Sequence, residues 1–500
     1  MHPTGQPVSA ESSEDTTWDL LVVGGGTAGL VSAHTAAGFG ARVLLVERAR
    51  TGGDCLWTGC VPSKALLASA STAARARDGG RLGIDVNGVS VDFARVMAHV
   101  RAAIQTIEPV DSAAALTAAG VEVQTGELSF TGPCSATVDG QPVRFTQAIV
   151  CTGSSPEIPP IPGLSEVGPL TSDSIWDLEA LPARLAVLGA GSVGCELGQA
   201  FARLGSTVTI VAESGRILDR EDPEAAQLVA ASLARDGVTL RTGTRVVRVT
   251  SRTSSHVLEL QDGTEVGFDQ VLVCAGVRPE TGGLGLDRAG VELDEHSYVR
   301  VDSRLRTTNP DIWAAGDVTG RARFTHTAGV DGSVAASNAV LGLRRRIDTT
   351  VPRVTFTDPE VAAVGLGTGS AASESGRHVV VRDHAHLDRA ITESDVDGFT
   401  KLVVDAGGRV LGATVVGPRA GESLGELSVA VRHGLRTRDL AATTHAYPTY
   451  SDAVWNASVD DFQARLRRPG LSHVLAVLVA GRRRWVRSSV RARLVQASRR

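Results

Sequence analysis

The sequence predicts an α/β fold built from two strand–turn–helix–strand units and a C-terminal α+β domain. The apolar run at residues 18–23 ends in glycines, and an Ala- and Val-rich stretch of helical length and a strand at 43–46 follow it. The same order returns at residues 185–211. A strand, a glycine turn and a helix in this order are typical of a parallel βαβ unit. From residue 351 to about 460, strand and helix patterns alternate, which indicates a third domain.

The first glycine turn matches G-x-G-x-x-G through Gly24, Gly26 and Gly29, and Glu47 stands at the end of the next strand. Glycines at these positions allow a tight turn and a close approach of the backbone to a pyrophosphate at the helix N-terminus. The acid at the end of the second strand can accept hydrogen bonds from ribose hydroxyls. We therefore expect a dinucleotide site here rather than a glycine-rich loop without function.

The second glycine turn repeats this pattern through Gly189, Gly191 and Gly194, so a second dinucleotide is expected. The stretches on either side then divide the chain into six segments. These are a polar tail (1–17), a first dinucleotide-binding domain (18–160), an inserted second one (161–285), a return to the first (286–350), the α+β domain (351–460) and a basic extension (461–500).

Length and composition are those of a multidomain globular protein. The chain has 500 residues, 42% of them hydrophobic, and its formal net charge of -5 gives no reason to expect nucleic-acid binding. No apolar run is long enough to span a bilayer and residues 1–17 lack the pattern of a secretion signal, so we expect a cytoplasmic location. Six cysteines are too few for a disulfide scaffold, which directs attention to the close pair Cys55 and Cys60.

The cysteine pair has the spacing C-x4-C, and we expect it to open a helix, with both sulfurs meeting over one turn. The helix N-terminus would lower the pKa of a thiolate there, as a redox-active dithiol requires. A structural disulfide and half of a zinc site are the alternatives, but no second cysteine pair or histidine cluster completes a zinc site, and we expect no resident metal. Lys64 follows closely and is one of only two lysines, the other being Lys401.

Residues 52–64, G-G-D-C-L-W-T-G-C-V-P-S-K, resemble the redox motif of the class I pyridine nucleotide–disulfide oxidoreductases, which include dihydrolipoyl dehydrogenase, glutathione reductase and mercuric reductase. The resemblance covers residues 18 to about 458. It implies a homodimeric enzyme that passes a hydride from NADH or NADPH through FAD to a Cys55–Cys60 disulfide, and on to a small electrophilic acceptor. Cys60 would then be the sulfur next to the flavin, Cys55 the sulfur that exchanges with substrate, and Lys64 the partner of Glu196.

The same resemblance implies further cofactor-binding residues. They are Thr152, Gly153 and Ser154 on the adenosine side, Gly276 beside the nicotinamide domain, Asp317 at the ribitol chain, and Phe324, Thr325 and His326 against the isoalloxazine ring. The choice between NADH and NADPH stays open. Glu213 would repel a 2′-phosphate, which favours NADH, while Arg216 and Arg220 lie close enough in sequence to attract one.

One segment departs from the family pattern. In disulfide reductases of the family, the partner subunit completes the active site with a His-Pro segment and a glutamate, and the histidine is the general base. Here Tyr447 takes the histidine's place and Asp452 the glutamate's, while His445 is an alternative base. A tyrosine with its ordinary pKa of about 10 is a poor base, so we expect an acceptor other than the common disulfides.

Mercuric reductase is similar to this sequence in having tyrosine at the aligned position. Reduction of a metal ion or a quinone is therefore the alternative activity. Mercuric reductase also uses a cysteine pair near its C-terminus, whereas the last cysteine here is Cys274.

The chain after Asp461 contains no acidic residue and many arginines. A basic helix on an anionic membrane surface is one interpretation, and a membrane-associated flavoprotein that acts as an interaction module is the corresponding alternative class. A solvated or disordered extension, or one that docks on the dimer, is favoured. Cys55, Cys60 and Lys64 also argue for an enzyme, because an interaction module has no use for a redox dithiol.

Overall fold

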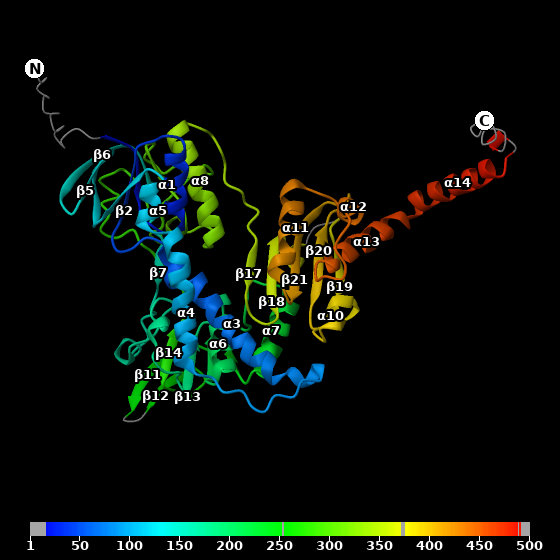
Figure 1. Cartoon of the computed structure of the whole chain (residues 1–500), viewed down its shortest axis with the longest axis horizontal. Helices are drawn as coiled ribbons and strands as arrows, with labels where there is room; N and C mark the ends of the chain where they lie inside the picture. Colours follow the sequence, from blue (N-terminus) through cyan, green and yellow to red (C-terminus); the bar gives the residue numbers. More distant parts are fainter. Residues whose placement is uncertain (1–16, 253–254, 372–375, 489, 492–500) are drawn as a thin grey trace, which may run out of the picture. The chain divides into compact units, whose positions relative to one another are not determined.

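The computed structural model describes residues 17–252, 255–371, 376–488 and 490–491, and the chain forms two compact units (Figure 1). Unit 1 holds the chain up to Asp219 together with Ala230–Val351, and unit 2 holds Arg220–Val229 together with the chain from Pro352. The predicted α/β class with a C-terminal α+β domain is confirmed. The finer division into six segments stays a prediction, and the predicted polar tail lies outside the described residues except for residue 17.

The first sheet of unit 1 has seven strands, in the order β3-β2-β1-β6-β5-β4, with β16 paired to β6. The pairs among β1, β2, β3, β6 and β16 are parallel, as a βαβ unit requires. The strands are β1 (Thr17–Val23), β2 (Val43–Glu47), β3 (Val121–Thr125), β4 (Leu128–Gly132), β5 (Ser135–Val138), β6 (Gln141–Val150) and β16 (Ile312–Ala314). The helices α1 (Thr27–Gly38) and α8 (Thr325–Leu341) pack on it and share one hydrophobic core with it.

The second sheet is fully parallel, in the order β10-β9-β8-β14, and carries the second glycine turn between β8 and α6. Its elements are β8 (Arg184–Leu188), α6 (Ser192–Leu204), β9 (Thr207–Ala212), β10 (Thr239–Thr242) and β14 (Gln270–Val273). The helix α7 (Pro223–Arg235) follows β9 in the sequence, and its residues up to Val229 belong to unit 2. Two antiparallel groups accompany it, namely β11 (Val246–Arg252), β12 (Ser255–Leu260) and β13 (Glu265–Phe268), and the pair β7 (Ser154–Pro156) and β15 (Val277–Pro279).

Four α-helices separate β2 from β3: α2 (Gly53–Trp57), α3 (Cys60–Arg77), α4 (Phe93–Ile107) and α5 (Ala113–Ala118). The prediction that both cysteines lie on one helix is wrong. The carbonyl of Asp54 accepts hydrogen bonds from the amides of both Thr58 and Gly59, which closes α2 before α3 begins. Cys55 therefore lies on the short α2, and Cys60 is the first residue of α3.

Unit 2 is an antiparallel sheet in the order β17-β18-β21-β20-β19, with helices packed against it. The strands are β17 (Arg353–Thr355), β18 (Glu360–Gly365), β19 (His378–Asp383), β20 (Phe399–Val404) and β21 (Val410–Gly417). The helices are α9 (Thr368–Ala371), α10 (Asp388–Thr392), α11 (Ala420–His433), α12 (Thr437–Ala442), α13 (Asp452–Leu466) and α14 (Pro469–Val486). The predicted basic extension is thus helical over most of its described length, rather than a disordered tail.

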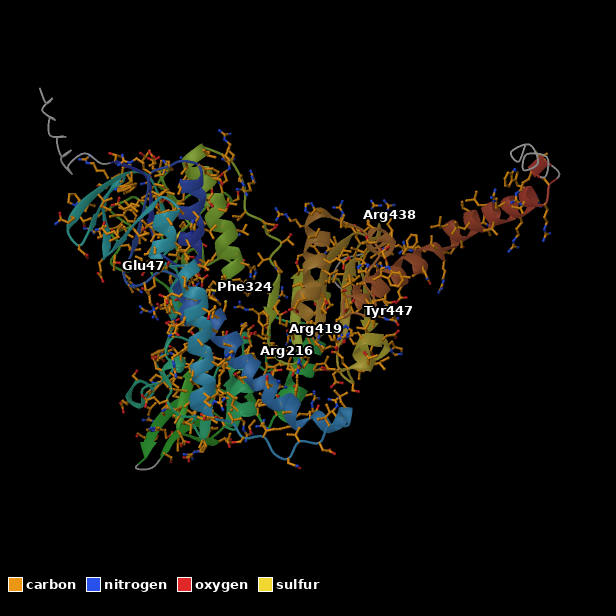
Figure 2. All side chains as sticks on the ribbon, in the orientation of Figure 1. Glu47, Arg216, Phe324, Arg419, Arg438 and Tyr447 are labelled. Atoms are coloured by element: carbon orange, nitrogen blue, oxygen red, sulfur yellow. The ribbon has the colours of Figure 1, made fainter. Side chains whose placement is uncertain are left out.

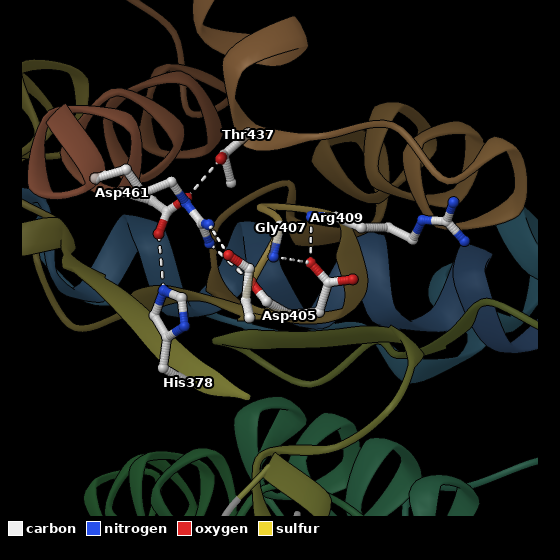
Figure 3. Close-up of polar contacts among 8 residues, drawn as sticks. His378, Asp405, Gly407, Arg409, Thr437 and Asp461 are labelled. Carbon is white, nitrogen blue, oxygen red and sulfur yellow. Dashed lines mark hydrogen bonds and ion pairs between the residues drawn. The ribbon is translucent and has the colours of Figure 1, made fainter. Parts of the chain in front are cut away.

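A buried carboxylate ties the end of α13 to the rest of unit 2 (Figure 3). Asp461 accepts hydrogen bonds from Thr437 (2.5 Å) and from Nε of Arg465 (2.6 Å), and it lies 2.7 Å from Nε2 of His378. Arg465 also donates to the carbonyls of Ala406 and Asp405. These bonds connect α12 and α13 with β19 and with the turn between β20 and β21, and they fix the position at which α13 ends.

Replacing Asp461 by asparagine is expected to lower the free energy of unfolding by about 2 kcal/mol, because it leaves Arg465 without its charged partner. Burial raises the pKa of Asp461, but the bonds from Arg465, Thr437 and His378 outweigh it and hold the pKa below 3.8. The carboxylate therefore stabilises the protein above about pH 4, and this contribution is lost as the pH falls further. Urea unfolding of the wild type and of Asp461→Asn, at neutral and at acidic pH, measures this contribution to the free energy of unfolding. Asp460→Asn, on a half-exposed neighbour, should behave like wild type.

Candidate active site

The first glycine turn has the tight geometry that a dinucleotide site requires. Gly24 has φ +105°, and a Cβ there would lie 2.5 Å from the carbonyl of Cys151. A Cβ on Gly29 would lie 1.9 Å from the carbonyl oxygen of Gly24, so neither position admits a side chain. Glu47, labelled in Figure 2, accepts a hydrogen bond of 2.6 Å from the amide of Gly25. Glu47 thus stabilises the glycine turn through this hydrogen bond. Its contact with a ribose stays a prediction.

The second glycine turn repeats this geometry. Gly189 has φ +110°, and a Cβ there would clash with the carbonyl of Cys274. A Cβ on Gly194 would lie 2.0 Å from the carbonyl of Gly189. Gly191 has no atom within 4 Å of its Cβ position, so the backbone at the start of α6 is open to a phosphate. Both turns therefore fit a dinucleotide.

The residues that bear on the choice of nicotinamide cofactor follow β9. The side chain of Glu213 is exposed directly after the strand. Arg216 is bonded to the carbonyl of Asp219 within its own loop. The carboxylate of Glu213 therefore stands where the ribose of the second dinucleotide is expected. Arg216, one of the two arginines that could attract a 2′-phosphate, is already bonded to its own loop.

The two cysteines face each other as an unequal pair of thiols. Their sulfurs are hydrogen-bonded, and Sγ of Cys60 lies 3.2 Å from Oγ1 of Thr325 at the start of α8. The hydrogen bond from Cys55 lowers the pKa of Cys60 to about 6 against the effect of burial, with smaller contributions from Thr325 and Lys64. The same bond, together with burial, raises the pKa of Cys55. At neutral pH the pair therefore holds one proton on Cys55, and Cys60 is the thiolate.

We expect the reduced Cys55→Ser protein to show a single thiolate that titrates near pH 6, because the serine hydroxyl still donates to Cys60. Cys55→Ala removes the largest cause of the shift and should move the titration towards the ordinary thiol range. The far-ultraviolet absorbance of the thiolate measures the titration in both variants. Each spectrum is taken as a difference against the same variant that also carries Cys60→Ser. Equal midpoints in the serine and alanine proteins would show that Cys55 does not set the pKa of Cys60.

The predicted pair of Lys64 and Glu196 is present in the structure. Nζ of Lys64 lies 3.0 Å from Oε2 of Glu196, which joins α3 to α6, and the glutamate side chain is only 7% exposed. The other lysine, Lys401, is also in a buried ion pair, with Asp222 at 3.0 Å. Lys64 places a compact positive charge next to Cys60, where it favours the thiolate.

The remaining predicted flavin residues also lie together in unit 1. Ser154 donates a hydrogen bond of 3.0 Å to Asp317, and Thr152 donates to the carbonyl of Glu280. Gly153 between them has φ +73°. Phe324 and His326 precede and follow Thr325 in the sequence, and their rings stack with the centroids 5.2 Å apart. Gly276 connects β14 to β15, which pairs with β7.

Sequence reasoning missed two features next to the dithiol. It placed Thr325 only against the flavin ring, whereas the hydroxyl contacts the sulfur of Cys60. It also gave no role to Asp54, an exposed residue whose pKa is raised to about 6 by desolvation from the surrounding chain, with further contributions from Asp173 and Asp317. No local pattern signals either feature, because the residues concerned are far apart in the sequence.

A cavity of about 580 Å³ lies beside α2 and α4. Trp57 and Trp176 line it together with the side chains of Met97 and Ile104, while Cys55 and Cys60 do not. The indole N–H of Trp176 donates to the carbonyl of Thr58, between the two cysteines. The cavity wall therefore supports the segment that holds the sulfurs.

The expected acid–base group in unit 2 is a phenol bonded to a carboxylate that the sequence did not indicate. Tyr447 is 71% exposed, and its hydroxyl donates to Asp388, which raises the pKa of the phenol. Asp452 is buried at the start of α13 and accepts a long hydrogen bond of 3.5 Å from the amide of Thr449. His445 has both ring nitrogens engaged, with Glu426 at 2.8 Å and the carbonyl of Thr443 at 3.0 Å, so its geometry does not favour it as the base.

Two dinucleotide turns, a dithiol with one low-pKa sulfur, and a C-terminal α+β unit define a dinucleotide-dependent dithiol oxidoreductase. Residues 18–332 match the model of the pyridine nucleotide-disulphide oxidoreductase family, and residues 351–458 match the dimerisation domain of that family. The chain belongs to this family.

Among its relatives, the mercuric reductase of Streptomyces lividans is 36% identical over 88% of this chain and 95% of its own length. The dihydrolipoyl dehydrogenase of Thermus scotoductus is 36% identical over 88% and 97%. Among solved structures, LpdA of Mycobacterium tuberculosis aligns with a TM-score of 0.82 at 31% identity, over 89% of this chain and 99% of its own. RclA of Escherichia coli, an HOCl-induced flavoprotein disulfide reductase, aligns with a TM-score of 0.80 at 27% identity, over 88% and 99%.

As a member of this family the protein is an oxidoreductase that uses FAD and NAD(P)H, which sets aside the alternative of a non-enzymatic interaction module. The dimerisation domain supports a homodimer. In the described part of the chain, no helix combines the length and the apolarity that crossing a membrane requires.

Proposed function

We propose that this protein is an NADH-driven reductase in which the Cys55–Cys60 pair delivers electrons to a small electrophilic acceptor other than the common disulfides. The observation that carries the proposal is the unequal dithiol, in which the pKa of Cys60 is lowered to about 6 and that of Cys55 is raised. Bound FAD supplies the two-electron relay between the nicotinamide and the disulfide. Glu47, Asp317 and the two glycine turns would hold the cofactors.

The redox step balances within the pair of sulfurs. Two electrons and one proton open the disulfide to the Cys60 thiolate and the Cys55 thiol, with Lys64 beside the thiolate. When the dithiol returns two electrons to the acceptor, the S–S bond forms again and the proton leaves Cys55. Glu213 supports NADH as the donor, because its carboxylate would repel a 2′-phosphate.

The acceptor is proposed from the chemistry of Tyr447, which we infer completes the site of the partner subunit. Its hydrogen bond to Asp388 raises the pKa of the phenol, so the group stays protonated at neutral pH. If its single O–H turns from Asp388 to the acceptor, the phenol can donate a hydrogen bond to an acceptor oxygen, but it cannot take the proton from a thiol, as the family's histidine does. We therefore propose an oxygen-bearing acceptor such as a quinone, rather than lipoamide or glutathione disulfide.

A soft metal ion is the second candidate acceptor, and the mercuric reductases among the relatives favour it. Two cysteine side chains that are hydrogen-bonded to each other can bind such an ion as thiolates. The sequence has no cysteine after Cys274 to bring the ion to the site. The retained dithiol and the use of NADH also lead us to propose a cytoplasmic location.

Anaerobic titration of the purified protein with NADH tests the reductive half of the proposal. A long-wavelength absorption band of the Cys60 thiolate beside the flavin should appear after two electrons, and NADPH should produce it at a higher concentration. A panel of quinones, Hg(II), lipoamide and glutathione disulfide tests the oxidative half. Faster turnover of lipoamide or glutathione disulfide than of every quinone and of Hg(II) would refute the acceptor class, and a protein without flavin would refute the whole proposal.

A further inference from the structure

The helix α14 (Pro469–Val486) presents its apolar side chains to solvent. Figure 1 shows it continuing from α13 away from the sheet of unit 2, and none of its residues is buried. The side chains of Val474, Val477, Leu478 and Val479 are 49% to 62% exposed. The neighbouring α13 buries Ala453, Val454 and Ala457 in the core, so α14 differs from a helix that packs on its own domain.

The apolar part of α14 surrounds the helix rather than forming a single stripe. Val477, Leu478 and Val479 are consecutive, and successive residues of an α-helix point about 100° apart. Together they cover most of the circumference. A groove on another protein would cover one face and leave the others in water, whereas a hydrocarbon layer accommodates all of them.

Arginines flank the apolar segment at both ends. Arg467 and Arg468 precede it, Arg482, Arg483 and Arg484 follow it, and the sequence has no acidic residue after Asp461. Residues 470–481 span about 18 Å as a helix, which is too short for a bilayer core of about 30 Å. A short apolar helix with cationic ends suits shallow insertion below a layer of anionic headgroups, with the arginines reaching back to the phosphates.

We propose that α14 is a membrane-surface anchor that inserts into an anionic lipid leaflet. A second copy of α14 is a poorer occupant, because it would bring the two arginine clusters together without any intervening acid. Trp485, over which Arg482 lies at 4.2 Å, provides the aromatic side chain that favours the interface. The Asp461 network fixes the end of α13, so insertion of α14 would hold unit 2 at the lipid surface. The inference does not depend on the identity of the acceptor.

Co-sedimentation of the full-length holoenzyme with vesicles tests the anchor. Binding to vesicles that contain phosphatidylglycerol should exceed binding to pure phosphatidylcholine at least tenfold, and deletion of residues 469–500 should remove it. Flavin content and NADH oxidation should be unchanged by the deletion, because α14 contributes no buried residue. Retained vesicle binding by the deletion variant would overturn the proposal. So would a change in oligomeric state on deletion without any vesicle binding by the full chain, which would indicate a second copy as the occupant.

Two matched variants separate charge from insertion. Arg482→Gln with Arg484→Gln should weaken binding at least fivefold, while Arg344→Gln with Arg346→Gln, in another run of three arginines, should have no effect. Val477→Asn with Leu478→Asn keeps every charge and should also weaken binding at least fivefold. If the asparagine variant binds like wild type, α14 does not insert, and the proposal is wrong.

Discussion

Cys60→Ser is expected to lower kcat for the best acceptor of the panel by at least about 10³-fold, because the variant cannot form the disulfide that receives the electrons. The long-wavelength band in the NADH titration should disappear with it, since Cys60 is the thiolate of the pair. Flavin content should be retained. Steady-state turnover with the best acceptor of the panel, together with the anaerobic spectrum, measures both effects.

Cys134→Ser is the matched control, because Cys134 is an exposed cysteine that has no part in the dithiol. It should leave turnover and spectrum unchanged. Cys55→Ser should keep the thiolate of Cys60 but lose turnover, which separates the spectroscopic role of one sulfur from the exchange role of the other. If Cys60→Ser reduces the best acceptor at more than about a tenth of the wild-type rate, electrons reach that acceptor without the dithiol.

Tyr447→His combined with Asp452→Glu is expected to raise turnover of lipoamide or glutathione disulfide by about 10²-fold, the lower range of general acid–base catalysis. The double variant restores the residue pair that disulfide reductases of the family use. An imidazole has an ordinary pKa of about 6.5, so it can take a thiol proton at neutral pH, whereas the phenol cannot. The dependence of kcat/KM on pH should gain an acidic limb, in which activity falls below a midpoint near the pKa of histidine because the imidazole must be unprotonated to act as the base.

Tyr447→Phe is the control of equal size, and it should not raise the reduction of either disulfide. Asp388→Asn addresses the partner that the structure gives to Tyr447, and it should lower the pKa of the phenol without creating a base. Unchanged disulfide turnover in the double variant, with intact flavin content, would show that residue 447 does not decide the class of acceptor.

The chemistry of the site was predictable wherever it depends on local backbone geometry or on residue identity. Gly24, Gly29 and Gly189 occupy positions that exclude a Cβ, and such constraints act within one strand–turn–helix unit. The spacing of Cys55 and Cys60 indicated a redox pair, although the break between α2 and α3 depends on two amides that share one carbonyl, which residue spacing does not reveal. The Lys64–Glu196 pair crosses 132 residues, and it was predicted only through the family resemblance.

The sequence alone determined the fold class, the two glycine turns and the close cysteine pair, because each is written in a short motif. The family resemblance added the expectation that Tyr447 stands in the place of a histidine. Only the tertiary structure decided which groups contact those residues. Thr325 reaches Cys60 across 265 residues, and Tyr447 bonds to Asp388 rather than to Asp452. Such contacts follow from how helices and strands pack and from the direction in which each side chain leaves its backbone, and residue spacing along the chain does not encode either one.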